Sequence, residues 1–119
     1  MTDAATDKHI SITPEHPEPG TTVLRISGEV DMLTSPVLRE ALSDHLASGA
    51  QRLVLDLNDV PFMGTSGLAV LVEARAGALD KNIDLWLVCT KRATLRSLDV
   101  AGLRPLFQVA DTVTQALAT

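Results

Sequence analysis

The sequence predicts an α/β fold: a mixed sheet of four to five strands, antiparallel in an N-terminal hairpin and parallel thereafter, packed with about four helices. Three observations support this fold class. Strand-like and helical segments alternate along most of the chain. Residues 52–57 form a mainly apolar run, typical of a strand buried on both faces of a parallel sheet. Two short strands precede the first helix, and the chain of 119 residues suits a single domain, which we place at residues 9–119.

The N-terminal segment is expected to form the hairpin. Residues 1–8 are polar and aperiodic, and we expect them to be flexible. Residues 9–13 alternate Ile10 and Ile12 with polar neighbours, as a half-buried strand does. Residues 14–20 hold three prolines and a glycine, which predicts a loop. Residues 22–27 are the second strand, so the loop joins an antiparallel pair.

Two helices flank the apolar strand at 52–57. The first is expected to be capped by Ser35, with Pro36 in the first helical position, and to end at Gly49. The second is expected over residues 65–79, ending at Gly77 or just beyond. Its core-facing stripe comprises Leu68, Leu71, Val72 and Leu79. Its other residues leave a smooth, weakly polar face, made of Ala69, Val70, Ala76 and Gly77.

The C-terminal part repeats the alternation of strand and helix. Residues 82–89 contain the next strand, and Thr90 is expected to cap a third helix that stops at Gly102. Residues 106–109 are predicted to be a short edge strand. Asp111 is expected to cap a last short helix. The predicted order is therefore strand, strand, helix, strand, helix, strand, helix, short strand, helix.

Composition excludes several functions. The net charge is −5, there is no basic cluster, and aromatic residues are only 3%, so nucleic-acid binding is not expected. No apolar run approaches the roughly 20 residues that span a bilayer, and the start of the chain does not resemble a signal peptide, so we expect a cytoplasmic protein without membrane contact. The single cysteine, Cys89, is expected to pack as a small apolar residue.

The corner Gly64-Thr65-Ser66-Gly67 is the main chemical feature of the chain. It places two hydroxyl groups where a strand gives way to an apolar helix. Thr65 or Ser66 is expected to be the N-cap, and Gly67 to keep the first turn slim enough for another molecule to approach. The unpaired amides of a helix start favour anionic oxygen, including phosphate. The corner therefore predicts either a phosphorylation switch or a simple capping sequence.

Two motifs resemble those of a known family. The segment Asp56-Leu57-Asn58-Asp59-Val60-Pro61-Phe62-Met63-Gly64-Thr65-Ser66-Gly67-Leu68 is similar to the signature of STAS domains, specifically of bacterial anti-anti-sigma factors, also called anti-sigma factor antagonists. The segment Gly28-Glu29-Val30-Asp31 resembles a second motif of that family, at the end of the second strand. The resemblance implies the STAS fold. It also implies a regulator that binds an anti-sigma factor serine/threonine kinase, releases the sigma factor, is inactivated by phosphorylation, and is restored by a phosphatase.

The resemblance also assigns residues. It makes Thr65 the phosphoacceptor, with Ser66 as the alternative, and it puts Asp31 close to the acceptor at the end of the adjacent strand. The residues that it implies for partner binding are Asp31, Met63, Gly64, Thr65, Ser66, Gly67 and Leu68. This chain departs from the family pattern at two positions, because Gly64 stands where an Asp is usual and the acceptor is Thr instead of Ser. The additional methyl group of Thr is stiff at χ1.

Other functional classes remain as alternatives. The chain could be a STAS scaffold or sensor that binds a small ligand, a nucleotide or a protein assembly without being phosphorylated. Asp31, Asp56 and Asp59 invite comparison with a phospho-receiver domain, but the first strand lacks the acidic pair that such a domain needs. We expect no catalytic residues, no metal site and no cofactor, because no acid–base pair or ligand cluster is spaced for them.

Overall fold

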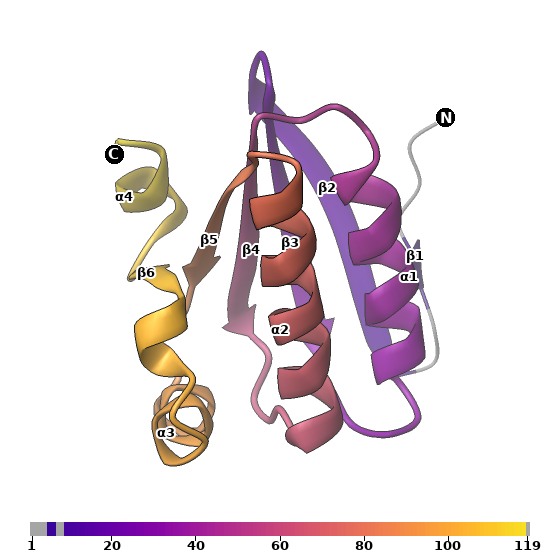
Figure 1. Ribbon diagram of the computed structural model, residues 1–119. Coiled ribbons are helices and arrows are strands. Elements are labelled where there is room, and N and C mark those ends of the chain that lie inside the picture. The colour runs from indigo at the N-terminus through magenta and orange to yellow at the C-terminus, as the bar shows by residue number, and fades with distance from the viewer. Residues whose placement is uncertain (1–4, 7–8, 119) are drawn as a thin grey trace.

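The computed structural model describes residues 5–6 and 9–118, which form one mixed sheet with helices on both faces (Figure 1). The six strands follow the order β1-β2-β3-β4-β5-β6. Antiparallel pairing joins the first three, β1 (Ala5–Thr6), β2 (Ile10–Glu18) and β3 (Thr21–Gly28). Parallel pairing joins β3 to β4 (Arg52–Asp59), β5 (Asp84–Val88) and β6 (Gln108–Ala110). The predicted fold class is confirmed, with one strand more than the expected maximum.

The helices cover the two faces of the sheet unequally. α1 (Ser35–Leu46) and α2 (Thr65–Asp80) lie side by side on one face, and α3 (Arg92–Val100) lies at the end of the sheet where α2 begins (Figure 1). A short 3-10 turn, Arg104–Leu106, follows α3. α4 (Val113–Leu117) packs on the opposite face, against β4, β5 and β6. Among the described residues, no helix is both long enough and apolar enough to cross a bilayer.

The strand at the centre of the sheet is buried on both faces, as predicted. Leu53, Leu55 and Leu57 of β4 belong to the main core, beneath α1 and α2. Val54 belongs to a smaller core on the other face, with Ala116 of α4. The alternation follows from the period of two in a strand. Because β4 is fixed from both sides, the chain leaves it in a defined direction toward the Gly64 corner.

One prediction about the N-terminal part is wrong. Residues 14–20 are not simply a loop, because β2 continues to Glu18 and only Pro19 and Gly20 form the turn. Among the described residues, β1 pairs with β2 at Ser11 and Ile12 and no described strand pairs with β2 on that side beyond them, where proline is tolerated because its missing donor is not needed. Within residues 1–8, which are expected to be flexible, Ala5–Thr6 forms β1 and the other six lie outside the described residues.

Helix ends also differ from the predictions. The N-caps are the residues before or after the predicted ones: Thr34 in place of Ser35, Gly64 in place of Thr65 or Ser66, Lys91 in place of Thr90, and Thr112 in place of Asp111. α1 ends at Leu46, before Gly49, whereas α2 ends at Asp80, just beyond Gly77 as predicted. Sequence shows that a polar residue can cap, whereas the exit direction of the preceding strand decides which backbone position turns into the helix.

The predicted faces of α2 need one correction as well. Val70, assigned to the smooth face, is buried, and Leu79, assigned to the core stripe, is 61% exposed. α2 packs on α1 as well as on the sheet, so its buried sector is wider on that side than one stripe. Ala69 and Ala76 are exposed, as expected for the smooth face.

Candidate functional site

The two sequence motifs meet at one end of the sheet, where β3 and β4 finish. Val30, which follows β3, donates its amide to the carbonyl of Phe62 (3.0 Å), and the amide of Gly64 donates to the carbonyl of Val30 (2.8 Å). Val30 and Met63 thereby form a parallel bridge, and both side chains are buried. The Gly64 corner is thus fixed against the residues that follow β3. The carboxyl ends of parallel strands are a common place for binding sites in open α/β sheets.

Gly28 explains the first motif in physical terms. Its φ is +107°, a region that side chains disfavour, and a Cβ atom there would lie 2.1 Å from the carbonyl oxygen of His9. β2 therefore approaches β3 too closely for any other residue. The chain leaves β3 at Gly28, and this turn directs Val30 toward the corner.

Thr65 is exposed and is the first residue of α2. Gly64 is the N-cap, with φ −80° and ψ 178°, and its carbonyl accepts from the amides of Gly67 (3.0 Å) and Leu68 (3.1 Å). No side chain caps the helix, so the amides of Thr65 and Ser66 have no acceptor within it. Ser66 is half-buried. The helix start therefore presents free amides and a free hydroxyl at one exposed position.

Three residues assigned to partner binding are buried beneath the corner. The side chains of Met63 and Leu68 are 1% and 5% exposed and belong to the core. Gly67 is also buried, and a Cβ atom there would lie 2.6 Å from Cγ1 of Val30 and 2.8 Å from Cγ of Met63. Gly67 therefore allows the helix to pack on its own fold, and the expectation that it keeps the turn open for another molecule is wrong. These residues position the surface from below.

Asp31 organises the segment between β3 and α1. Its Oδ1 accepts from the amides of Leu33 (2.9 Å) and Thr34 (3.0 Å), and the Thr34 hydroxyl donates to the carbonyl of Glu29 (2.8 Å). The hydrogen bond from the Thr34 amide, supported by that from Leu33, holds the pKa of Asp31 below its ordinary value. This carboxylate stabilises the turn that carries the residues beside the corner.

Sequence reasoning missed three exposed apolar side chains near the corner. Met32 is 80% exposed, Leu33 is 79% exposed and Phe62 is 50% exposed. Met32 and Leu33 follow Asp31, and Phe62 is bonded through its carbonyl to Val30, so the three belong to the two segments that the Val30–Met63 bridge joins. We call Met32, Leu33 and Phe62 the apolar rim. The signal for it was the presence of large apolar residues in turn segments, which have no helical or strand period to bury them.

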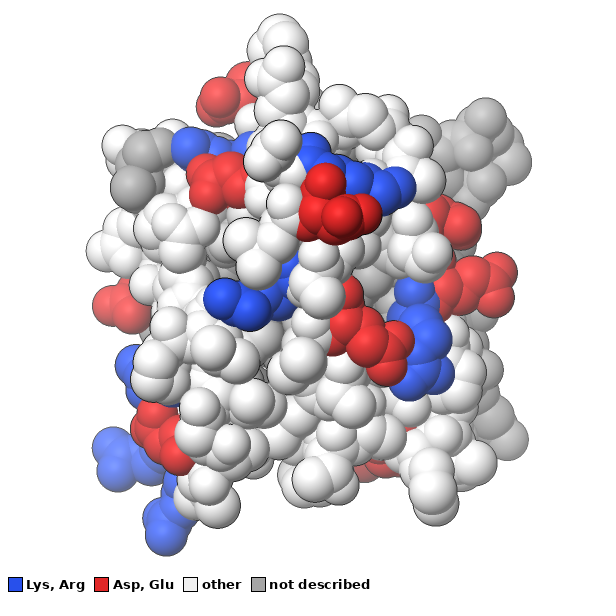
Figure 2. Space-filling model, in the orientation of Figure 1, with Lys and Arg blue, Asp and Glu red and all other residues white. Residues whose placement is uncertain are grey.

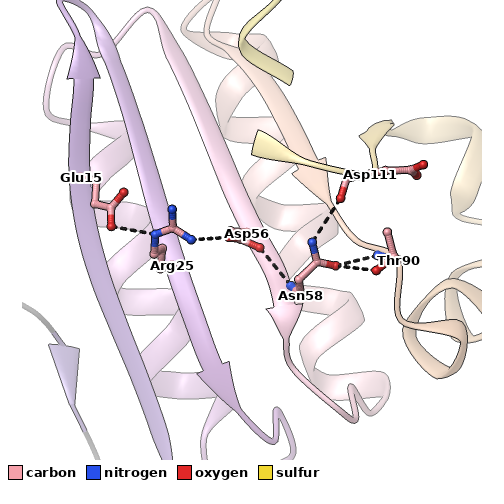
Figure 3. Close-up of polar contacts among 6 residues, drawn as sticks. All are labelled: Glu15, Arg25, Asp56, Asn58, Thr90 and Asp111. Atoms are coloured by element: carbon pink, nitrogen blue, oxygen red, sulfur yellow. Dashed lines mark hydrogen bonds and ion pairs between the residues drawn. The ribbon is translucent and has the colours of Figure 1, made fainter. Parts of the chain in front are cut away.

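Asp56, one of the carboxylates that suggested a phospho-receiver domain, takes part in a network of polar contacts across the sheet (Figure 3). Asp56 accepts from Nη1 of Arg25 (2.9 Å) and from the amide of Asn58 (3.0 Å), and Arg25 is also paired with Glu15 (2.7 Å). Asn58 in turn accepts from the amide of Thr90 (2.7 Å). The network connects β2, β3, β4 and the end of β5 across the sheet. The carboxylate of Asp56 therefore links neighbouring strands through its hydrogen bonds.

No group of His, Cys, Asp and Glu with metal-binding geometry occurs in the described part of the chain. Cys89 is buried, and desolvation raises the pKa of its thiol. Its packing agrees with the expected role of a small apolar residue. The chemistry of this end of the molecule is thus concentrated in the exposed helix start and the apolar rim.

Comparison with known proteins decides the family. The STAS domain profile matches residues 13–116, which is most of the chain. The chain belongs to the STAS family. The STAS match covers both motifs and all described strands except β1 and the first residues of β2.

Relatives of this STAS domain narrow the resemblance to one group. The anti-sigma-F factor antagonist RsfB of Mycobacterium tuberculosis is 33% identical over 98 residues, covering 82% of this chain and 80% of that protein. The anti-sigma-B factor antagonist of Bacillus subtilis is 31% identical over 87 residues, covering 73% and 79%. A crystal structure of an anti-sigma factor antagonist from Mycobacterium paratuberculosis has a TM-score of 0.85 and 32% identity over 96% of each chain. The predicted resemblance to anti-sigma factor antagonists is confirmed.

Proposed function

We propose that this STAS domain is an anti-sigma factor antagonist that binds an anti-sigma factor serine/threonine kinase and so releases a sigma factor. Phosphorylation of Thr65 by that kinase switches it off, Ser66 is the alternative acceptor, and a phosphatase restores it. The proposal implies that the protein acts in the cytoplasm. The observation that carries the proposal is the exposed hydroxyl of Thr65 on the first residue of α2, beside a fixed and uncapped helix start.

The apolar rim supports the binding half of the proposal. Three large apolar side chains stay in water at the residues joined to the corner, and their burial against a partner supplies about 25 cal/mol for each Å² removed from water. Asp31 holds the turn that presents Met32 and Leu33, and Gly64 is half-buried, so part of it is accessible to a partner. Met63, Gly67 and Leu68 contribute by holding this surface in place.

The position of Thr65 supports the switching half. A phosphate adds a charge of roughly −1.5 to −2 and three acceptor oxygens. At the start of α2 these oxygens can accept from the free amides of Thr65 and Ser66, so the modification leaves the core intact. In a complex, the same charge would be trapped beside the apolar rim and removed from water, which is strongly unfavourable. Phosphorylation therefore opposes binding without opposing folding.

The test compares Thr65→Ala, Thr65→Glu and Ser66→Ala in binding to purified candidate anti-sigma factor kinases, with intact mass measured after incubation with ATP. Wild type and both alanine variants are expected to bind, while Thr65→Glu is expected to bind at least about tenfold more weakly. One phosphate is expected on wild type and Ser66→Ala but not on Thr65→Ala, whereas a phosphate on Thr65→Ala and none on Ser66→Ala would assign the alternative acceptor, Ser66. Equal binding by all four proteins would show that Thr65 is not the switch.

One observation favours a second function, a STAS scaffold or sensor that binds a ligand or protein assembly without phosphorylation. Gly64 occupies the position where the family pattern has Asp, although its backbone conformation is open to any residue and a Cβ atom would only touch Phe62 at 3.4 Å. The fold does not require glycine here, so the absent carboxylate is a chemical difference. A chain that binds the kinase, or another partner, and gains no phosphate under any kinase tested would support this function.

A further inference from the structure

Contrary to the expectation of no basic cluster, basic side chains without a partner among the described residues concentrate at α3 of this acidic chain. Four of the ten Lys and Arg residues lie between positions 91 and 104, while the net charge of the chain is −5. Elsewhere in the described residues, the arginines are engaged: Arg25, Arg39 and Arg52 form ion pairs, and Arg75 donates to the carbonyl of Leu106. In contrast, Lys91, Arg92 and Arg96 are exposed, and their side chains form no hydrogen bond or ion pair with the described residues. We call these three residues the α3 basic cluster.

The α3 basic cluster opposes the stability of its own helix. Lys91 is the N-cap and Arg92 the first residue of α3, and no acidic residue lies in the first turn, so cations occupy the positive end of the helix dipole. Arg92 and Arg96 are four residues apart on one face, a spacing at which like charges repel. The nearest compensation, the ion pair of Asp99 with Arg104 (3.3 Å), leaves all three cations of the cluster unpaired. An acidic surface placed against the cluster would relieve both kinds of repulsion.

The α3 basic cluster lies at the same end of the molecule as the Thr65 corner. α2 and α3 both begin at the carboxyl ends of the neighbouring parallel strands β4 and β5 (Figure 1). The Thr94 hydroxyl of α3 donates to the carbonyl of Val60, in the segment that leads from β4 to Phe62 (3.4 Å). Figure 2 shows basic side chains, with an acidic one among them, at the lower left where Figure 1 has α3, next to a largely uncharged surface. A protein that covers the corner and extends toward β5 would meet the cluster.

We propose that the α3 basic cluster is a second contact surface for the anti-sigma factor, and that it meets an acidic surface on that partner. This inference rests on the proposed function. The apolar rim and the cluster then have different tasks, because apolar contact slows dissociation while complementary charge mainly accelerates association. The low aromatic content favours a protein surface over nucleic acid as the ligand, and the exposed cations of the cluster favour an acidic one.

The test measures the association rate constant with the anti-sigma factor kinase that binds in the experiment above, at low and high ionic strength. Arg92→Glu is expected to slow association by about 3- to 10-fold at roughly 20 mM salt and to have little effect near 0.5 M, where charges are screened. Arg92→Lys keeps the charge and should restore the wild-type rate. Lys81→Glu, a matched exchange of an exposed and unpaired cation at the far end of α2, should change the rate less than about twofold.

The stability of Arg92→Glu is the control that separates a binding role of Arg92 from a purely structural one. Arg92→Glu places an acid in the first turn of α3 and opposite Arg96, so its midpoint of urea denaturation should equal or exceed that of wild type while its association slows. A lower midpoint with an unchanged rate overturns the inference, as does an equal slowing by Lys81→Glu. It is also overturned if Arg92→Glu abolishes binding of a short DNA duplex but leaves the kinase rate unchanged. If Arg92→Glu associates at the wild-type rate while Thr65→Glu still weakens binding, this inference alone is refuted. If wild type binds no kinase, the proposed function is refuted and the inference with it.

Discussion

Two glycines in α2 should respond in opposite ways to the same substitution. At Gly67, the Cβ of alanine would lie 2.6 Å from Cγ1 of Val30 and 2.8 Å from Cγ of Met63, both in the buried bridge beneath the corner. At Gly77, it would meet only Cδ1 of Leu46, at 3.1 Å. That atom is the end of a flexible side chain at the edge of a hollow of ≈ 350 Å³ between α1 and α2, so it has space to move.

The expected magnitudes follow from these contacts. Overpacking a core position costs about 1–3 kcal/mol, and replacing glycine by alanine within a helix contributes at most about 1 kcal/mol in the other direction. Gly67→Ala should therefore lower the free energy of unfolding by about 1–2 kcal/mol. Gly77→Ala should leave it unchanged or raise it by up to about 1 kcal/mol.

Urea denaturation followed by circular dichroism measures the difference directly. With a slope of about 1–3 kcal/mol per molar urea for a domain of this size, the two midpoints should differ by about 1 M. The Val30→Ala exchange removes the nearer of the two clashing atoms, so the double variant Val30→Ala/Gly67→Ala should lose less stability than the sum of its single changes. If Gly67→Ala is as stable as Gly77→Ala, the close packing assigned to the corner is refuted.

Three further predictions concern single side chains. Gly64→Asp should raise the free energy of unfolding by a few tenths to about 1 kcal/mol at pH 7, because the backbone accepts a side chain there and α2 gains a charged N-cap; a loss of stability in urea would contradict this. Burial, and next the charge of His16, lowers the pKa of His45 below its ordinary 6.5, so the folded state favours the neutral ring and the free energy of unfolding falls as the pH drops through 6.5 toward that lower value. His45→Gln should therefore reduce the fall of the urea midpoint between pH 8 and pH 5. An NMR titration of His45 with a midpoint at or above 6.5 would refute this prediction. Because burial raises the pKa of the Cys89 thiol, Ellman's reagent should modify it only as the protein unfolds, and rapid modification of native protein at pH 7.5 would be the contrary result.

Local patterns predicted the parts of this protein that depend on local physics. The mainly apolar run in residues 52–57 predicted a strand buried on both faces, and the apolar periodicity from Thr65 onward predicted a helix that starts at a hydroxyl-bearing residue. Both predictions hold because side-chain direction repeats every two residues in a strand and every 3.6 in a helix. The fold class and the start of the site followed from these periods.

Positions that depend on a neighbouring segment were predicted less well. Among the described residues, Pro14 to Glu18 lie beyond the pairing with β1 and form the edge of the sheet, and the sequence of β2 carries no information on that limit. Val70 is buried because α1 packs beside α2, whereas Leu79 lies on the other side of α2, next to Leu106 and Phe107, where it is 61% exposed. Periodicity identifies which residues share a face, whereas only the packed neighbour decides how wide the buried part of that face is.

By itself, the sequence determined an α/β chain with a helix that begins at an accessible hydroxyl, because backbone periods and turn chemistry are local properties. The tertiary structure alone decided what surrounds that hydroxyl. The bridge between Val30 and Met63 brings two segments about thirty positions apart into contact, buries Gly67 beneath them and leaves the apolar rim in water. Such contacts depend on strand pairing over long separations, which no local pattern encodes.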